Sequence, residues 1–223
     1  MMNQKLYQGG CMLYLQKGNF QKVVRWMAGA WMSANQATVL GLCFVVLTAF
    51  GFYVGLTYGK YQWLLLLVPV FLVLRMAMNA LDGMLAREYD TGSVAGELFN
   101  EGLDIVGDTI CYGCLFFIPN PPHLSLTLFL ILAWMAEYVG VLGKGLPGGV
   151  RRHETFLGGK PDRAVWMGGL ALLLYFFPSR VEDIAAYLII VSFFVFLTSI
   201  VRVRKILIAS EDESYESYTW IGK

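Results

Sequence analysis

Runs of apolar residues long enough to cross a lipid bilayer divide this sequence, and they determine what the chain can fold into. A membrane-spanning helix needs about 20 mostly apolar residues, because only a helix satisfies its own backbone hydrogen bonds where there is no water. With 57% hydrophobic side chains, the chain is too apolar for a soluble domain with a single core. We therefore predict an all-α integral membrane protein with six transmembrane helices, at residues 36–57, 62–86, 94–118, 123–143, 163–178 and 184–203, the fifth of them short.

The segment before the first apolar run has a different character. Residues 18–32, GNFQKVVRWMAGAWM, mix aromatic and aliphatic residues with Lys22 and Arg25, which is typical of a juxtamembrane amphipathic helix in the membrane interface. Polar residues interrupt the first 20 positions, so we expect no cleaved signal peptide. We divide the chain into an N-terminal segment with this helix (1–35), a six-helix transmembrane domain (36–206) and an acidic cytoplasmic tail (207–223).

Basic residues are unevenly distributed between the two sides of the predicted bundle. All but three of the 17 lysines and arginines fall on the side that holds both termini, and the exceptions are Lys60, Arg75 and Arg180. Because cytoplasmic loops collect Lys and Arg, we predict a multi-pass protein of the cell inner (cytoplasmic) membrane with both termini cytoplasmic. The net charge of +1 gives no indication of a nucleic-acid partner.

Charged and amide side chains cluster inside two of the apolar runs. Four carboxylates in the run 94–118 are spaced by four, three and four residues, which places them on one helix face with Asn100 beside them. They are Glu97, Glu101, Asp104 and Asp108. The polar face of the preceding helix consists of Arg75, Asn79, Asp82, Gly83 and Ala86. Charge within a membrane span is costly, so each of these residues is a candidate functional residue.

A line of carboxylates in a low-dielectric environment needs a cation, since like charges repel and each carboxylate loses its hydration. Hard divalent ions with oxygen ligands, Mg²⁺, Mn²⁺ or Ca²⁺, are suited to neutralise it. The small residues Gly83, Ala86 and Gly96 leave room for two helices, or for a phosphate, to approach closely. The alternative is a polar seam that stabilises helix association, or a hydrated ion pathway, without chemistry.

These residues resemble the pattern of the CDP-alcohol phosphotransferase family (CDP-alcohol phosphatidyltransferases), DxxDGxxAR followed after eight residues by GxxxDxxxD. The spacing matches throughout, and six of the eight motif positions are identical. The corresponding positions here are Asn79, Asp82, Gly83, Ala86, Arg87, Gly96, Asn100 and Asp104.

The similarity extends beyond this motif. Asn35 and Thr38 at the start of the first apolar run resemble the family's NxxT, without the usual preceding proline, and GGKPDRA with Lys160 resembles its glycine–lysine segment. The resemblance implies six spans after a juxtamembrane helix, in agreement with the apolar runs. Thr38 and Asn35 are also suited to cap the first helix.

The resemblance implies roles for individual residues. In the family, four aspartates surround a pair of divalent metals and the fourth is proposed as the base that activates the acceptor hydroxyl, which here is Asp104. One or two Mg²⁺ or Mn²⁺ ions are then expected on Asn79, Asp82, Asn100, Asp104, Asp108 and Glu101, the last two added because they share the helix face. The lipid nucleotide is expected to contact Asn35, Thr38, Asp82, Gly83, Ala86, Arg87 and Gly96.

Two departures fall at metal positions, because Asn79 and Asn100 replace the first and third motif aspartates. An amide oxygen can coordinate a metal but brings no charge. Arg75, about one turn from Asn79, adds a positive charge. Our hypothesis is that the guanidinium of Arg75 supplies part of the positive charge that metal ions would otherwise bring, so that the site holds one metal or a rearranged pair.

The activity implied by the resemblance belongs to phospholipid biosynthesis. It is the metal-dependent transfer of a phosphatidyl group from CDP-diacylglycerol to an alcohol, with release of CMP, at a site that faces the cytoplasm. The implied partners are CDP-diacylglycerol and membrane lipid, a small polar alcohol, and a second copy of the chain in a homodimer. Two alternatives are a catalytically altered family member that binds lipid nucleotide and a cation-coupled membrane transporter.

The acceptor is left open by the sequence, and glycerol phosphate, serine or an inositol compound would each suit. A phosphorylated acceptor would find counter-charges near the loop 144–163, at Arg151, Arg152, Lys160 and Arg163. The alternative is the ordinary cytoplasmic bias of basic residues and their attraction to anionic lipid. Glu137, about two turns from Lys144, either forms a structural pair or lines the acceptor pocket.

Overall fold

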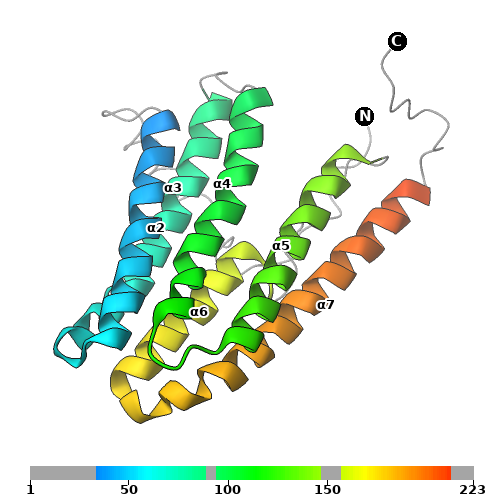
Figure 1. Ribbon diagram of the computed structural model, residues 1–223. Coiled ribbons are helices and arrows are strands. Elements are labelled where there is room, and N and C mark those ends of the chain that lie inside the picture. Colours follow the sequence, from blue (N-terminus) through cyan, green and yellow to red (C-terminus); the bar gives the residue numbers. More distant parts are fainter. Residues whose placement is uncertain (1–33, 89–93, 147–156, 212–223) are drawn as a thin grey trace.

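Six long helices make up most of the chain that the structure describes. In this computed structural model the described residues are 34–88, 94–146 and 157–211, and they contain no β-strand. The helices in Figure 1 are α2 (Ala34–Thr57), α3 (Val68–Glu88), α4 (Val94–Gly113), α5 (His123–Gly145), α6 (Lys160–Phe176) and α7 (Ile184–Glu211). Each predicted apolar run overlaps one of these helices, so the all-α fold class is confirmed.

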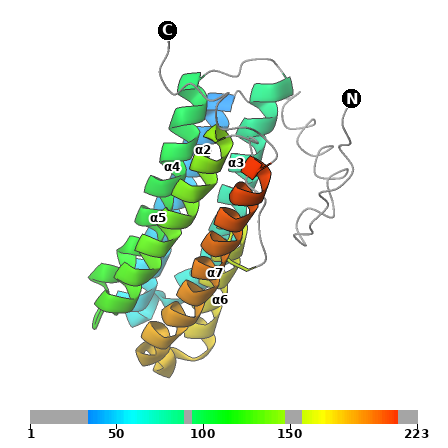
Figure 2. The same cartoon turned by 90° about the vertical axis from the view of Figure 1, so that its right-hand side faces the viewer.

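Consecutive helices run in opposite directions. Short 3₁₀ segments lie between helices at one end of the bundle, and they are η2 (Gly59–Leu66), η3 (Cys114–Phe117) and η4 (Pro178–Asp183). At the other end α2 and α4 begin and α3, α5 and α7 end; we call it the motif end, because the motif residues of α3 and α4 lie toward it. Figures 1 and 2 show α2 beside α3 and α5 beside α7, while α6 packs against α3 and begins deeper in the bundle.

Within residues 34–88, 94–146 and 157–211, four helical segments are long and apolar enough to cross a membrane, which makes this a multi-pass membrane protein. They are Gln36–Thr57, Gly59–Gly83, His123–Gly145 and Pro178–Ser210. The other two helices differ for physical reasons, since α4 carries four carboxylates and α6 has only 17 residues. That α4 and α6 also cross the membrane stays a prediction.

Two predictions concern the ends of the chain, namely the interfacial helix and the start of the C-terminal tail. The expected interfacial helix at 18–32 lies outside the described residues. The last helix, α7, continues to Glu211, beyond the predicted start of the tail at 207, and the rest of the tail lies outside the described residues.

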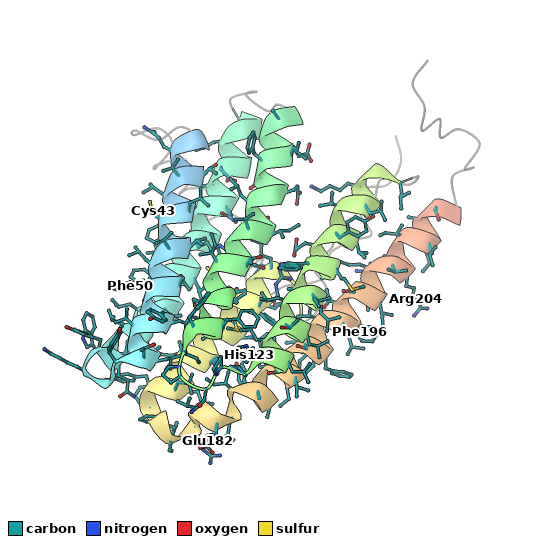
Figure 3. All side chains as sticks on the ribbon, viewed as in Figure 1. Cys43, Phe50, His123, Glu182, Phe196 and Arg204 are labelled. Atoms are coloured by element: carbon teal, nitrogen blue, oxygen red, sulfur yellow. The ribbon has the colours of Figure 1, made fainter. Side chains whose placement is uncertain are left out.

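Apolar side chains occupy both the inside and the outside of the bundle. Leu72 of α3, Phe129 of α5 and Met167 of α6 are buried in the main core. Figure 3 shows Phe50 of α2 and Phe196 of α7 projecting away from the helices, and they are 55% and 45% exposed. Large apolar side chains spread over a whole exterior fit a surrounding of lipid, because in water they would form an extensive exposed apolar surface.

Local hydrogen bonds fix the segment that leads into α6. The backbone N–H of Gly159 donates to Oδ2 of Asp162 at 3.0 Å, the reciprocal half of a helix-start cap. Pro161 lies in the first turn, where its missing N–H costs nothing. The indole Nε1 of Trp166 donates to the carbonyl of Leu157 at 2.9 Å. These contacts set where the first turn of α6 enters the bundle.

Gly158 lets the same segment lie directly against α7. A Cβ at this position would meet the carbonyl oxygen of Phe194 at 2.5 Å and the Cα of Val195 at 2.8 Å, as well as the side chain of Thr198. Backbone atoms cannot turn aside as the end of a side chain can, and helix interiors leave few voids. The close approach therefore requires glycine.

Replacing Gly158 by alanine should destabilise the protein by about 1–3 kcal/mol, because α6 or α7 must shift to admit the methyl group. The apparent free energy of unfolding in mixed detergent micelles, followed by circular dichroism during SDS titration, measures the change. Gly113→Ala is the matched control, since a Cβ there meets nothing within 4 Å. Equal stability of the two variants would contradict the packing of Gly158 on α7.

Candidate active site

Eight charged side chains are buried in the described part of the bundle, with equal numbers of each sign. None is more than 9% exposed, and they come from every helix between α3 and α7. The four basic residues are Arg75, Lys160, Arg163 and Arg202, and the four acidic residues are Asp82, Asp104, Asp108 and Glu137. An unpaired charge in a low-dielectric interior is costly, so the pairing of these groups determines the site.

The group nearest the motif end is centred on Asp82 of α3. Thr38 of α2 donates its hydroxyl to Oδ2 of Asp82 at 3.2 Å. The other carboxylate oxygen, Oδ1, is buried without a hydrogen-bond partner. Asp82 also lies within electrostatic range of Asp104 and Lys160. A buried carboxylate oxygen that lacks a donor needs a cation or a donor from a ligand.

About one turn deeper, Asn79 and Asp104 connect α3 to α4. Nδ2 of Asn79 donates to Oδ1 of Asp104 at 3.0 Å. Lys160, the first residue of α6, donates its ammonium group to the same oxygen and forms a buried ion pair with Asp104. A carboxylate at position 79 has no N–H to donate, so the amide forms a bond here that an aspartate could not.

Deeper again, Asp108 of α4 lies between two arginines. Nη2 of Arg75 is 2.8 Å from Oδ1, and Nη2 of Arg163 is 2.7 Å from Oδ2. Arg163 also contacts Oε1 of Glu137 on α5 at 2.8 Å, and Nη1 of Arg202 on α7 lies 4.0 Å from that oxygen. A continuous chain of charges therefore links α3, α4, α6, α5 and α7.

Arg75 reaches Asp108 across the backbone of α4. Its Nη2 atom donates to the carbonyl of Asp104 at 3.4 Å. A Cβ at Gly107 would lie 2.7 Å from the same nitrogen, so the absence of a side chain at Gly107 provides the space that the guanidinium occupies. Arg75 is thus fixed against α4, one turn from Asn79 on the same face of α3.

The two outer carboxylates of α4 face α5. Nζ of Lys144 is 2.5 Å from Oε1 of Glu101 and 3.4 Å from Oε1 of Glu97, whose side chains are 15% and 70% exposed. Lys144 therefore pairs with α4, whereas Glu137 forms its ion pair with Arg163. Every carboxylate of the α4 face has a basic side chain beside it.

The remaining predicted residues lie around this network. Asn100 is half-buried on α4, Gly83 is half-buried near the end of α3, and Gly96 is exposed in the first turn of α4. The predicted residues whose side chains lie outside the described part are Asn35, Ala86, Arg87, Arg151 and Arg152.

The oxygens near Asp82 suit a hard divalent cation better than those near Asp108. Asp108 and Glu101 contact basic side chains, which they would have to give up to bind a metal. Asp82 has its unbonded buried oxygen, and Asp104 and the amide of Asn79 lie close to it, although Asp104 is itself paired with Lys160. Among the described residues no group of three or more His, Cys, Asp or Glu is arranged for a metal, so an ion here would also need amide, water or substrate oxygens. The metal ligands stay predictions.

Sequence reasoning missed Arg202. An arginine at the end of an apolar run usually extends toward the membrane interface, and Arg202 was grouped with the other basic residues of that side. The missed signal is helical spacing, since Arg202 continues a series of buried residues on one face of α7, most of them three or four apart: Leu188, Val191, Val195, Thr198, Ser199, Arg202 and Ile206.

Arg163→Met should destabilise the protein by about 3 kcal/mol or more, because Asp108 and Glu137 would both lose a charged partner inside the bundle. SDS titration of the purified variant measures the loss. Arg180→Met is the matched control: Arg180 pairs with Asp183 at 3.0 Å, but its side chain is 66% exposed. Exposed ion pairs contribute about 1 kcal/mol or less to stability. Similar losses of stability in the two variants would mean that Arg163 does not form buried ion pairs.

Comparison with known proteins gives three results. The CDP-alcohol phosphatidyltransferase family model matches residues 31–202. The inner membrane protein YnbA of Escherichia coli (strain K12) is 32% identical over 206 residues, which are 90% of this chain and 98% of that protein. The crystal structure of Mycobacterium tuberculosis phosphatidylinositol phosphate synthase (PgsA1) with CDP-DAG bound has a TM-score of 0.64 and 16% identity, covering 92% of this chain and 98% of that one.

The structural similarity, at such low identity, establishes the fold. The sequence match spans the motif, all of the buried charged residues and nearly all of the described helices. This chain therefore belongs to the CDP-alcohol phosphatidyltransferase family.

Proposed function

We propose that this protein transfers a phosphatidyl group from CDP-diacylglycerol to the hydroxyl group of a small polar alcohol and releases CMP. The observation that carries the proposal is the convergence of Asp82, Asp104 and Lys160 inside the bundle toward the motif end. Family membership supports the reaction class, and the structural relative with CDP-DAG bound supports the donor.

The acceptor hydroxyl must lose its proton as it reacts. Its oxygen forms a bond to the lipid-side phosphorus, the bond from that phosphorus to the bridging oxygen breaks, and CMP leaves with the bonding electrons. We assign the base that takes the proton to Asp104. Hydrogen bonds from Asn79 and Lys160 hold this carboxylate in place, and the ammonium group offsets its charge.

We assign a Mg²⁺ or Mn²⁺ ion to the oxygens of Asp82, Asp104 and Asn79. When bound, it would offset the charge of the donor phosphates and orient them. Thr38 orients Asp82 through its hydrogen bond. We place Asn100, Glu101 and Asp108 in the surrounding charged shell. Contacts to the nucleotide and its phosphates are assigned to Asn35, Thr38, Gly83, Ala86, Arg87 and Gly96.

The site and the membrane must be arranged so that the nucleotide stays in water while the acyl chains stay in lipid. We propose that all six helices cross the inner membrane, with the motif end and both termini at the cytoplasmic face, and that two chains form a homodimer. Crossing by α4 is compatible with its carboxylates because Lys144, Lys160, Arg163 and Arg75 pair with them. The inner-membrane location of the relative YnbA supports this placement.

The direct test uses the full-length protein in lipid nanodiscs with CDP-diacylglycerol, Mg²⁺ and a panel of alcohols, and measures CMP. We expect CMP release that depends on the acceptor. Binding of the lipid nucleotide with no CMP from any acceptor would favour the binding-only alternative, and cation flux in vesicles without CMP would favour the transporter.

Asp104→Asn should lower kcat by about 100-fold or more, since the amide cannot take the hydroxyl proton. Binding of CDP-diacylglycerol, measured by calorimetry in nanodiscs, should be weakened far less. Asp183→Asn is the matched control, because Asp183 lies at the opposite end of the bundle with a 54% exposed side chain. Normal turnover by Asp104→Asn would remove Asp104 as the base.

Chelation with EDTA should reduce CMP release to background, and added Mn²⁺ should restore it. Asp82→Asn should raise the Mn²⁺ concentration needed for half-maximal activity and weaken direct Mn²⁺ binding, detected by electron paramagnetic resonance, by about tenfold or more. Asp108→Asn should leave Mn²⁺ binding much less affected, since Asp108 is paired with two arginines. If Asp108→Asn weakened Mn²⁺ binding more than Asp82→Asn, the metal would have to be assigned to Asp108 instead.

A further inference from the structure

The buried basic side chains of the site already have acidic partners. Lys160 pairs with Asp104, and Arg75 pairs with Asp108. Arg163 is shared between Asp108 and Glu137. In the part of the chain that the structure describes, the positive charge near the site is therefore used to neutralise the protein's own carboxylates.

Arg202, the fourth buried basic residue, has its Nη1 atom 4.0 Å from Oε1 of Glu137, and the other described basic residues do not add buried charge. Lys144 is bound to Glu101 and Glu97. Figure 3 shows Arg204 on the outer side of α7, where its side chain is exposed. Lys60 and Arg180 lie in the η2 and η4 segments at the opposite end of the bundle. Among the described residues, a ligand that enters the site thus meets equal numbers of buried basic and acidic side chains.

This balance limits the net charge that substrates can bring. The buried set contains four basic and four acidic residues. A divalent cation and the pyrophosphate of the donor, with one negative charge on each phosphate, leave the balance unchanged. A phosphate monoester on the acceptor would add about −1.5 to −2, and a low-dielectric interior penalises uncompensated charge strongly.

One unsatisfied buried atom at the site is a hydrogen-bond acceptor, whereas a phosphate needs donors. Oδ1 of Asp82 is a buried acceptor without a donor, which suits a cation or a hydroxyl group. If a phosphorylated acceptor drew Lys160 or Arg163 to itself, Asp104 would lose its ion pair with Lys160, or Asp108 would keep Arg75 alone and Glu137 would keep only Arg202 at 4.0 Å.

We infer that the acceptor carries no net charge: it is a neutral or zwitterionic alcohol rather than a phosphate monoester. This inference rests on the proposed function and narrows it. It departs from the expectation from the sequence that Arg151, Arg152, Lys160 and Arg163 would serve as counter-charges for a phosphorylated acceptor. Lys160 and Arg163 already have acidic partners, and Arg151 and Arg152 lie outside the described residues.

Matched acceptor pairs test this in the native protein. The full chain in nanodiscs with CDP-diacylglycerol and Mg²⁺ is given glycerol or glycerol phosphate and inositol or inositol phosphate, because both members of each pair keep a free hydroxyl, and serine is added as a zwitterionic acceptor. We expect kcat/KM, from CMP release, to be about tenfold or more higher for the unphosphorylated member of the pair that is used. A preference for the phosphorylated member would overturn the inference and leave the proposed function standing, and no CMP with any acceptor would overturn both.

Glu137→Gln tests the charge balance itself. The substitution keeps the size of the side chain but removes one negative charge beside Arg163 and Arg202. We expect the ratio of kcat/KM for the phosphorylated over the unphosphorylated member to rise by about tenfold. Asp183→Asn removes a negative charge at the exposed end and should leave the ratio unchanged. An unchanged ratio in Glu137→Gln would overturn the electrostatic basis of the inference.

Discussion

Neutralisation of charge inside the helix bundle is the constraint on which this structure depends. Four carboxylates and four basic groups are buried together, and each pairing joins side chains from different helices. Hydrophobic packing alone would let these helices slide, because lipid is as apolar as their surfaces. A buried ion pair restricts this sliding, because moving one partner away leaves the other charge unpaired in a low-dielectric environment. The positions of α4, α5 and α6 relative to one another are therefore set by electrostatics, with Arg163 at the centre.

The same pairing shapes the site above it. Arg163 lies one turn below Lys160 on α6, so the contacts that fix Arg163 also determine where Lys160 meets Asp104. Gly158 supports this arrangement from outside, because its close approach to α7 fixes the segment that begins α6. Catalytic groups must be held within fractions of an ångström, and here the deeper layer of ion pairs would position the groups proposed to react. Stability and the proposed activity would thus be coupled through one helix.

Much of the fold followed from the sequence, because helical membrane segments are encoded locally by length and apolarity. The four–three–four spacing from Glu97 to Asp108 correctly placed these carboxylates on one face of α4. The basic partners of these carboxylates could not be predicted in this way. The carboxylates were expected to need metal ions, yet Lys144, Lys160 and Arg163, some 50 residues away, supply much of the positive charge. Which distant residues meet depends on how helices pack, and spacing along one helix carries no information about that. Glu137 and Arg202 entered the network for the same reason.

The amide of Asn79 has a consequence for how this chain can change over evolutionary time. It donates a hydrogen bond to Asp104, whereas an aspartate at this position would set two carboxylates against each other. A single change of Asn79 to aspartate would thus be disfavoured unless a further cation separated the two acids. The identity of residue 79 and the supply of positive charge around Asp104 are therefore physically coupled, so that a change in one favours a compensating change in the other.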